Sequence, residues 1–162
     1  MSTPPKQNLP NLEDVVTGDI SGLFDAIPFV HWLGFSASRD AEGVLCVMPF
    51  ADRLIGNPVL PALHGGMVAT FLEATALAVV VDAQNDPDAR CGKEIPRMIS
   101  TTIDYLRPAG PKDTYGRAEI IRLGARLATV VATIWQEDPA RPVARANCHF
   151  LVASGGSAAS KS

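Results

Sequence analysis

Apolar residues in the first part of the chain follow spacings that change from helical to strand-like. Between Leu23 and Leu33 they recur at every third position, which predicts a short helix interrupted at Pro28. From Gly34 to Pro49, two short strands are expected on either side of a turn at 40–43. The stretch from Ala51 to Leu63 holds closely spaced prolines and glycines, so we expect an irregular loop there.

The strongest helix signal runs from Gly65 to about Asp82. This segment is rich in alanine, leucine, methionine and valine and is apolar on nearly every side, which is typical of a helix inside a protein. Its most apolar part, Met67 to Val81, spans fifteen residues and contains a glutamate, so we expect it to be too short to cross a bilayer. The polar segment 85–88 should end the helix.

The rest of the chain predicts four strands, which we expect to form an antiparallel meander. The last strand alternates most clearly, with small and apolar residues on one face and Arg145, Asn147 and His149 on the other. A sheet that shows one face to a helix buried on all sides explains both patterns and makes the fold class α+β. The strands are expected at 95–106, 114–123, 127–136 and 143–152.

The length of 162 residues fits a single domain. We expect a flexible, proline-rich arm over residues 1–20, the folded domain over 21–152, and a disordered tail rich in serine, glycine and alanine over 153–162. No apolar run follows Met1, so no signal peptide is expected and the protein should be cytoplasmic.

Composition and charge narrow the classes of ligand. Charged residues make up only 19% of the chain, which suggests additional buried surface such as a subunit interface. The net charge of −3 argues against a free-standing nucleic-acid-binding protein. Between Arg97 and Phe150, however, eight basic residues outnumber five acidic ones, which suits a ligand that carries phosphates. Cys46, Cys91 and Cys148 form no CxxC pair and predict buried thiols rather than a zinc site or a disulfide.

Glu73 is the one charged residue in the apolar part of the predicted helix. An unpaired carboxylate in a protein core costs several kcal/mol, so its presence needs an explanation. Three explanations are open. Glu73 pairs with a basic residue from elsewhere, it lies at a subunit boundary, or it faces a cleft in which a shifted pKa serves chemistry.

The sequence His64-Gly65-Gly66 stands at the predicted start of the same helix. Two glycines allow a ligand to approach the backbone closely, and free N–H groups at a helix N-terminus favour an oxyanion. The simpler interpretation is a tight turn into the helix. If both features are functional, about two and a half helical turns separate the N–H donors from Glu73. A dimer with two shared sites would bring a donor and a carboxylate from different chains together.

Three motifs resemble one known family in the right order along the chain. The segment from Leu63 to Glu73 is similar to the HGG…D/E signature of hotdog-fold thioesterases of the phenylacetate-pathway type, a group that also includes 4-hydroxybenzoyl-CoA thioesterases. The segments 105–109 (Tyr-Leu-Arg-Pro-Ala) and 124–128 (Gly-Ala-Arg-Leu-Ala) also match. The resemblance implies a curved sheet wrapped around a long helix, hydrolysis of acyl-CoA without metal or cofactor, and a homodimer or homotetramer with active sites between subunits.

The resemblance also implies roles for the matching residues. The carboxylate of Glu73 would act as general base or nucleophile, and the backbone amide of Gly65 would polarise the thioester carbonyl. His64 and Gly66 flank that amide and belong to the candidate site. Asn57, in the preceding loop, would place the substrate or the attacking water.

Other positions concern the nucleotide end of the substrate and the attacking water. Arg126 matches the hairpin on the nucleotide side, and with Arg107 it is expected to bind CoA phosphates. Many family members support the water with a serine or threonine on the strand after the helix. Counting back from the end of that strand gives Met98 at this place, with Ser100 and Thr101 as substitutes.

Two alternatives from other classes are open. One is a hotdog dehydratase or hydratase that acts on acyl thioesters, although Val59 stands where that branch would carry a histidine. The other is a non-catalytic acyl-ligand-binding oligomer on the same fold, because a fold does not imply an activity. Such a protein would have no need of a buried Glu73.

Overall fold

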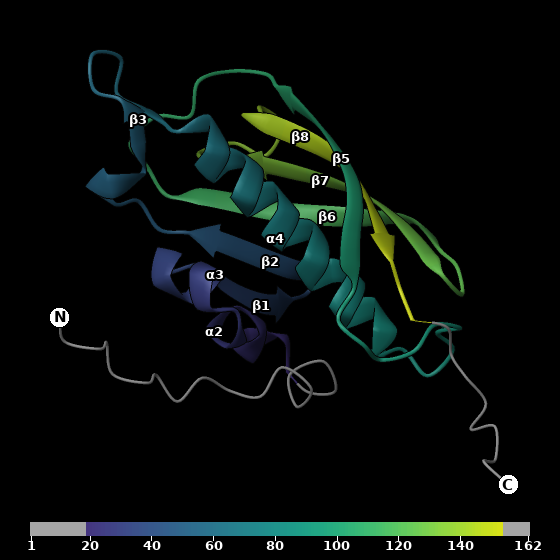
Figure 1. Ribbon diagram of the computed structural model, residues 1–162. Coiled ribbons are helices and arrows are strands. Elements are labelled where there is room, and N and C mark those ends of the chain that lie inside the picture. Colours follow the sequence, from purple (N-terminus) through teal and green to yellow (C-terminus); the bar gives the residue numbers. More distant parts are fainter. Residues whose placement is uncertain (1–18, 154–162) are drawn as a thin grey trace, which may run out of the picture.

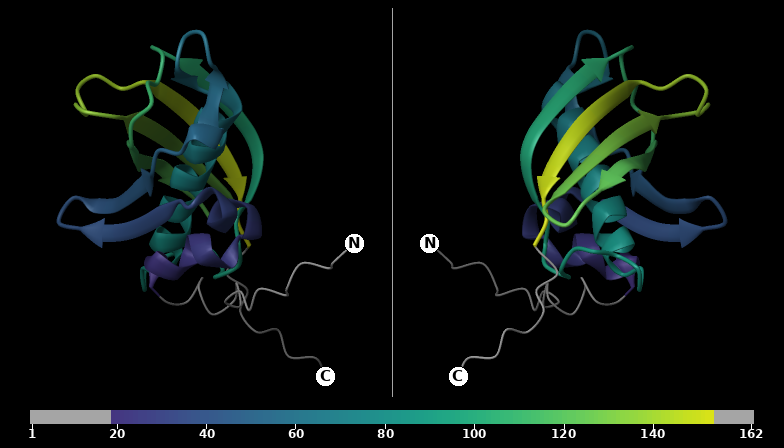
Figure 2. Two further views of the ribbon diagram at one scale, coloured as in Figure 1. Left: turned by 90° about the vertical axis from the view of Figure 1, so that its left-hand side faces the viewer. Right: turned by 90° about the vertical axis from the view of Figure 1, so that its right-hand side faces the viewer.

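Six strands form one antiparallel sheet that curves around the long helix α4 (Figures 1 and 2). The computed structural model describes residues 19–153, so most of the predicted arm and tail lies outside the described residues. The strands of this sheet are β1 (Ser36–Asp40), β2 (Gly43–Met48), β5 (Arg97–Tyr105), β6 (Thr114–Leu123), β7 (Leu127–Trp135) and β8 (Ala144–Leu151). The remaining elements are η1 (Ile20–Gly22), α2 (Leu23–Ala26), α3 (Pro28–Leu33), η2 (Asp52–Leu54), β3 (Ile55–Asn57), β4 (Ala62–Leu63) and α4 (Gly65–Gln84).

Most elements lie where the hydrophobic pattern predicts them. Pro28 separates α2 from α3, and β1 and β2 flank the expected turn. The alternation of β8 is also confirmed, because its even-numbered residues are buried and Arg145 and Asn147 are exposed. Ile20, predicted to end the arm, is only 5% exposed and packs into the core from η1.

The prediction of a four-stranded meander is wrong for β5. The sheet order is β1-β2-β6-β7-β8-β5, so β6, β7 and β8 are consecutive neighbours but β5 pairs with β8. β6 cannot accept β5, because one of its edges is paired with β7 and the other with β2, where Cys46 lies opposite Gly116. β5 therefore forms an edge of the sheet.

The segment predicted as an irregular loop contains η2 and a small hairpin of β3 and β4. Ile55 pairs with Leu63 and Asn57 with Ala62. The Oδ1 atom of Asn57 accepts hydrogen bonds from the backbone N–H groups of Val59 and Leu60, at 3.0 and 3.3 Å, and closes the hairpin. This side-chain turn is a common alternative to backbone pairing. The prediction of an irregular loop is therefore wrong for this segment.

α4 lies on the concave face of the sheet and contributes a large share of the core (Figure 1). It has 20 residues and is, by length and composition alone, long and apolar enough to span a bilayer, but half of its most apolar window is buried within the protein. Gly116 on β6 allows the close packing, because a Cβ at that position would lie 2.6 Å from the Oγ1 atom of Thr75.

Candidate active site

The N-terminus of α4 carries one unused backbone donor. The Nδ1 atom of His64, the N-cap residue, accepts the N–H of Gly66 at 2.9 Å. The N–H groups of Met67 and Val68 bond the carbonyl of His64. The N–H of Gly65 has no acceptor among the described residues. Of the two glycines predicted to stabilise an oxyanion, Gly65 is therefore the one with a free donor, and His64 serves as a helix cap.

Tyr105, the last residue of β5, holds the start of this helix from the side. Its hydroxyl donates a 3.0 Å hydrogen bond to the carbonyl oxygen of Gly65. Its ring also comes within ordinary contact distance, 3.7 Å, of the place where a Cβ on Gly65 would lie. The helix N-terminus is thus fixed to the end of the edge strand.

A cavity of about 370 Å³ opens beside Gly65 and Tyr105. Its walls are mostly apolar, as expected for a cavity that takes an acyl or pantetheine chain. The one charged residue in the wall is Arg107. The lining comes from β4, the first turns of α4, the end of β5, the loop after it and the residue before β8: Ala62, Leu63, Gly65, Val68, Tyr105, Leu106, Arg107, Pro108, Ala109 and Val143.

Glu73 is half-buried on α4, and its carboxylate has no hydrogen bond or ion pair with any other residue in 19–153. Burial raises the pKa of its carboxyl above the usual value for glutamate. The explanation by an ion pair within the subunit is therefore wrong. A cleft or a subunit boundary remains as the reason for this carboxylate.

Cys148 and Thr101 mark the surroundings of Glu73. The pKa of the Cys148 thiol is raised by burial and, to a smaller extent, by the nearby negative charge of Glu73. The Oγ1 atom of Thr101 lies 3.5 Å from the Sγ atom of Cys148. Of the three candidates on β5, Thr101 is thus the hydroxyl on the side of the carboxylate.

A bulge interrupts β5 next to Met98. The register with β8 shifts between Met98 and Ser100, so the face on which a residue lies cannot be found by counting in twos from the end of the strand. Cys148 was not foreseen as a neighbour of Glu73. Its place in the alternation of β8 predicted that it is buried, but not what it contacts.

Asn57 and Val59 belong to the β3–β4 hairpin. The Oδ1 atom of Asn57 is occupied by its own turn, and Val59 at the tip of the hairpin is 92% exposed. The position at which a dehydratase would carry its histidine therefore points into solvent.

Arg107 and Arg126 lie at opposite ends of β5. Arg107 follows Tyr105, whereas Arg126 shares a cavity of about 200 Å³ with Arg97, the first residue of β5, and with Glu94. The strand between Arg97 and Tyr105 spans about 27 Å. One subunit therefore does not bring the two predicted phosphate-binding arginines together.

Neither the histidines nor the cysteines assemble a metal site in the part of the chain that the structure describes. No three side chains of His, Cys, Asp or Glu within residues 19–153 are arranged to hold an ion. All three cysteines are free and buried, as their spacing predicts.

Comparison with known proteins decides the family. A sequence model of the thioesterase superfamily matches residues 60–151, from the β3–β4 hairpin to the end of β8. The chain belongs to the thioesterase superfamily. The predicted hotdog fold and the assignment to a class of thioester hydrolases are thereby confirmed, and this thioesterase places its helix N-terminus, cavity and Glu73 within the matched region.

Individual relatives agree with this assignment. The medium/long-chain acyl-CoA thioesterase YigI of Salmonella typhimurium is 26% identical over 121 residues, which are 69% of this chain and 77% of that protein. A thioesterase-superfamily protein from Shewanella oneidensis superposes with a TM-score of 0.69 at 27% identity, over 87% of this chain and 97% of the other. A phenylacetic acid degradation-related protein from Ralstonia eutropha shares the fold, with a TM-score of 0.66 and 23% identity over 82% and 96% of the two chains.

Proposed function

We propose that this thioesterase hydrolyses acyl-CoA thioesters, with the N–H of Gly65 as oxyanion donor and Glu73 as the reacting carboxylate. The observation that carries the proposal is the free Gly65 N–H, which lies at the positive end of a 20-residue helix and borders an apolar cavity. A donor fixed in this way stabilises the negative charge that develops on a thioester oxygen.

The reaction needs a base or nucleophile besides this donor. As a base, Glu73 takes a proton from water while the oxygen of that water bonds to the carbonyl carbon. The C–S bond then breaks, and the CoA sulfur leaves with the proton returned by the carboxyl. As a nucleophile, Glu73 forms a mixed anhydride that water hydrolyses in a second step. A carboxyl with a raised pKa suits proton transfer near neutral pH.

The two groups do not meet within one subunit. Gly65 and Glu73 are eight residues apart on one helix, which separates them by about 12 Å along its axis. A second copy would resolve this, since β5 offers a nine-residue edge most of whose residues are exposed. We propose a homodimer, alone or within a tetramer, in which Gly65 of one subunit works with Glu73 of the other.

The same dimer would unite the predicted phosphate contacts. If two β5 strands pair antiparallel around Ile103, Thr101 of one strand comes to lie opposite Tyr105 of the other, and the Arg97 end of the first lies beside the loop that carries Arg107 of the second. The Arg126 cavity of one subunit would then face Arg107 and the Gly65 cavity of its neighbour. We assign the CoA phosphates to these arginines on that basis.

A panel of acyl-CoAs with aliphatic chains of increasing length and with aromatic acyl groups tests the function. Release of free CoA thiol would be measured for the wild-type protein and for Glu73→Gln. We expect thiol release that depends on Glu73, and the name of the Salmonella relative favours the medium and long aliphatic members of the panel. Binding of acyl-CoA without thiol release would instead identify an acyl-ligand-binding protein, and conversion of an enoyl-CoA to its hydroxy derivative would identify a hydratase.

A further inference from the structure

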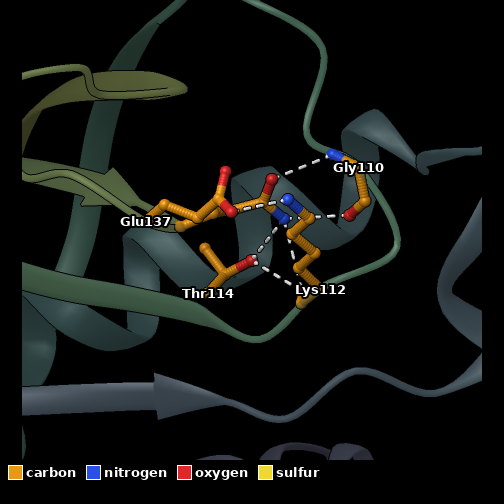
Figure 3. A network of polar contacts seen from close by, with 5 residues as sticks. Gly110, Lys112, Thr114 and Glu137 are labelled. Carbon is orange, nitrogen blue, oxygen red and sulfur yellow. Dashed lines mark hydrogen bonds and ion pairs between the residues drawn. The ribbon is translucent and has the colours of Figure 1, made fainter.

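Gln136 follows β7, and its side-chain amide is hydrogen-bonded to the loop between β5 and β6. Figure 3 shows the polar network to which Gly110, Lys112 and Thr114 belong. Its Oε1 atom accepts the N–H of Gly110 at 3.0 Å. Its Nε2 atom donates to the carbonyl oxygens of Gly110 at 2.9 Å and Lys112 at 3.3 Å, and it lies 3.3 Å from the Oγ1 atom of Thr114. One side chain thus holds both ends of the turn between Gly110 and Lys112.

The restrained loop forms a wall of the cavity beside Gly65. Leu106, Arg107, Pro108 and Ala109 belong to it and line that cavity. Backbone bonds hold the rest of the loop, from the N–H groups of Leu106 and Arg107 to the carbonyl of Val143 and from the N–H of Leu63 to the carbonyl of Ala109. Gln136 adds a side-chain restraint on the loop backbone, and it does not itself line this cavity.

The bond between Leu63 and Ala109 links this loop to the oxyanion donor. Leu63 precedes the N-cap residue His64, and its N–H lies 2.8 Å from the carbonyl oxygen of Ala109. Ala109 is in turn adjacent to Gly110, which Gln136 holds at both its N–H and its carbonyl. A continuous set of hydrogen bonds therefore runs from Gln136 through the loop to the residue that leads into α4.

We propose that Gln136 is a positioning residue for substrate binding, which keeps the loop 106–112 in the conformation that forms the cavity wall. This inference rests on the proposed function, in which that cavity receives the thioester end of acyl-CoA. Without the amide, the free protein samples other loop conformations and only a fraction of it is competent to bind. The apparent dissociation constant for the substrate rises as that fraction falls. Once substrate is bound, the loop is back in its wild-type conformation, so kcat changes little.

Gln136→Met tests the proposal, because methionine retains the length and volume of the side chain but cannot make these four contacts. We expect KM for acyl-CoA to rise about fivefold or more, as follows from losing one net hydrogen bond of restraint, with kcat changed less than about twofold. Hydrogen exchange of the backbone amides in 106–112 should accelerate in the unliganded protein while exchange in α4 and β7 stays as in wild type. Unchanged KM, a fall in kcat at constant KM, or unchanged loop exchange would each overturn the role.

Lys112→Met is the matched control in the same loop. It removes the exposed 2.7 Å ion pair with Glu137 but leaves the carbonyl of Lys112 free to accept from Gln136. Exposed ion pairs contribute little, so KM and loop exchange should match wild type. If Lys112→Met raises KM as much as Gln136→Met does, the loop is merely sensitive to any change and the proposal fails.

Gln136→Glu is a second test that does not depend on how well Gln136→Met folds. A carboxylate can still accept the N–H of Gly110 but cannot donate to the two carbonyls. Faster exchange across 110–112 and a raised KM are expected again, and wild-type values of both would count against the proposal. The exchange measurement needs no substrate, so it separates failure of this inference from failure of the proposed function. If the wild-type protein hydrolyses no acyl-CoA but the Gln136 variants still show faster loop exchange than wild type, only the proposed function is contradicted.

Discussion

The phenolic oxygen of Tyr105 lies 3.0 Å from the carbonyl oxygen of Gly65, so the last residue of the edge strand is hydrogen-bonded to the first residue of the central helix. Because the N–H of the same residue is the free donor, this bond restrains the residue whose N–H would face the thioester oxygen. We expect Tyr105→Phe, which retains the ring, to lower kcat about three- to tenfold, the value of one net hydrogen bond. Tyr115→Phe removes a hydroxyl from the outer face of the sheet and should leave kcat unchanged. Equal kinetics for both variants would show that the bond does not matter for turnover.

Gly65→Pro is expected to remove the oxyanion donor while preserving the helix. Gly65 is the first residue of α4, where proline is favoured, and the extended backbone of the N-cap, with φ −61° and ψ 132°, suits a residue before proline. We expect kcat to fall about 10²- to 10³-fold, as for other single oxyanion donors. Gly65→Ala adds a Cβ in ordinary contact with Tyr105 but retains the N–H, and it should retain most of the activity. Circular dichroism would confirm that both variants are folded.

Mixing two inactive variants tests whether sites are shared between subunits. A heterodimer of Gly65→Pro and Glu73→Gln contains one site with both defects and one site with neither, if the donor and the carboxylate come from different chains. Co-refolding equal amounts should therefore restore about one quarter of the wild-type specific activity, since half of the dimers are mixed. No restored activity in a mixture that sediments as a dimer would place the whole site in one subunit.

Glu73→Gln should lower kcat by about 10²- to 10⁴-fold if the carboxylate does the chemistry. In the wild type, kcat/KM should rise with pH through a pKa above the ordinary glutamate value, because burial raises the pKa and the ionised form is the active one. The variant should lose this limb of the pH profile. Full activity of a folded Glu73→Gln protein would contradict the mechanism.

The same substitution has a second, thermodynamic signature. A raised pKa means that the folded protein binds a proton at Glu73 more tightly than the unfolded chain does, so this group reduces stability as pH rises from the ordinary glutamate pKa through the folded one. Glu73→Gln and wild type should therefore have similar unfolding free energies at low pH. Above that window the variant should be the more stable protein in urea titrations. A variant less stable than wild type at neutral pH would indicate a favourable partner for the carboxylate.

Arg126→Ala should raise KM for acyl-CoA with little change in kcat, because binding to the nucleotide phosphates is the same in ground and transition states. The effect should disappear with acyl-pantetheine substrates, which lack the nucleotide. Arg107→Ala should act in the same direction. Arg145→Ala, an exposed position on the outer face of β8, serves as control. An equal increase of KM for both substrate types would argue against a phosphate contact.

The sequence indicates candidate site residues more readily than it indicates how they are arranged. Glu73 is a candidate from the sequence because a charge within an apolar helix is rare. Gly65 is a candidate because glycines at the start of a helix allow a ligand to approach the backbone. The position of the His64 ring decides which glycine has the free N–H, because the Nδ1 atom of that ring accepts the N–H of Gly66. This depends on side-chain geometry, which the spacing of residues along the chain does not predict.

Errors in the prediction arose where long-range pairing overrides local pattern. The alternation within β5 and β6 identifies each as a strand but does not identify their neighbours, so the pairing of β6 with β2 could not be read from it. The bulge in β5 also depends on pairing with another strand. Between Met98 and Ser100, β5 has one residue more than β8, and this leaves no clear mark in the sequence. Thr101 was therefore one of three candidates until the register was known.

The pairing of β5 with β8 also determines when this protein can fold. Thr101 and Cys148, which contact each other in the finished structure, are separated by 47 residues. During synthesis α4 and β5 leave the ribosome while β6, β7 and β8 are still to be made, so the apolar faces of the helix are covered only in part, by earlier elements such as β2 and η1. Pairings this distant close slowly, and apolar surface left open in the meantime favours aggregation. In the nascent chain, β5, the strand that carries Thr101, therefore stays without this partner until β8 has been synthesised.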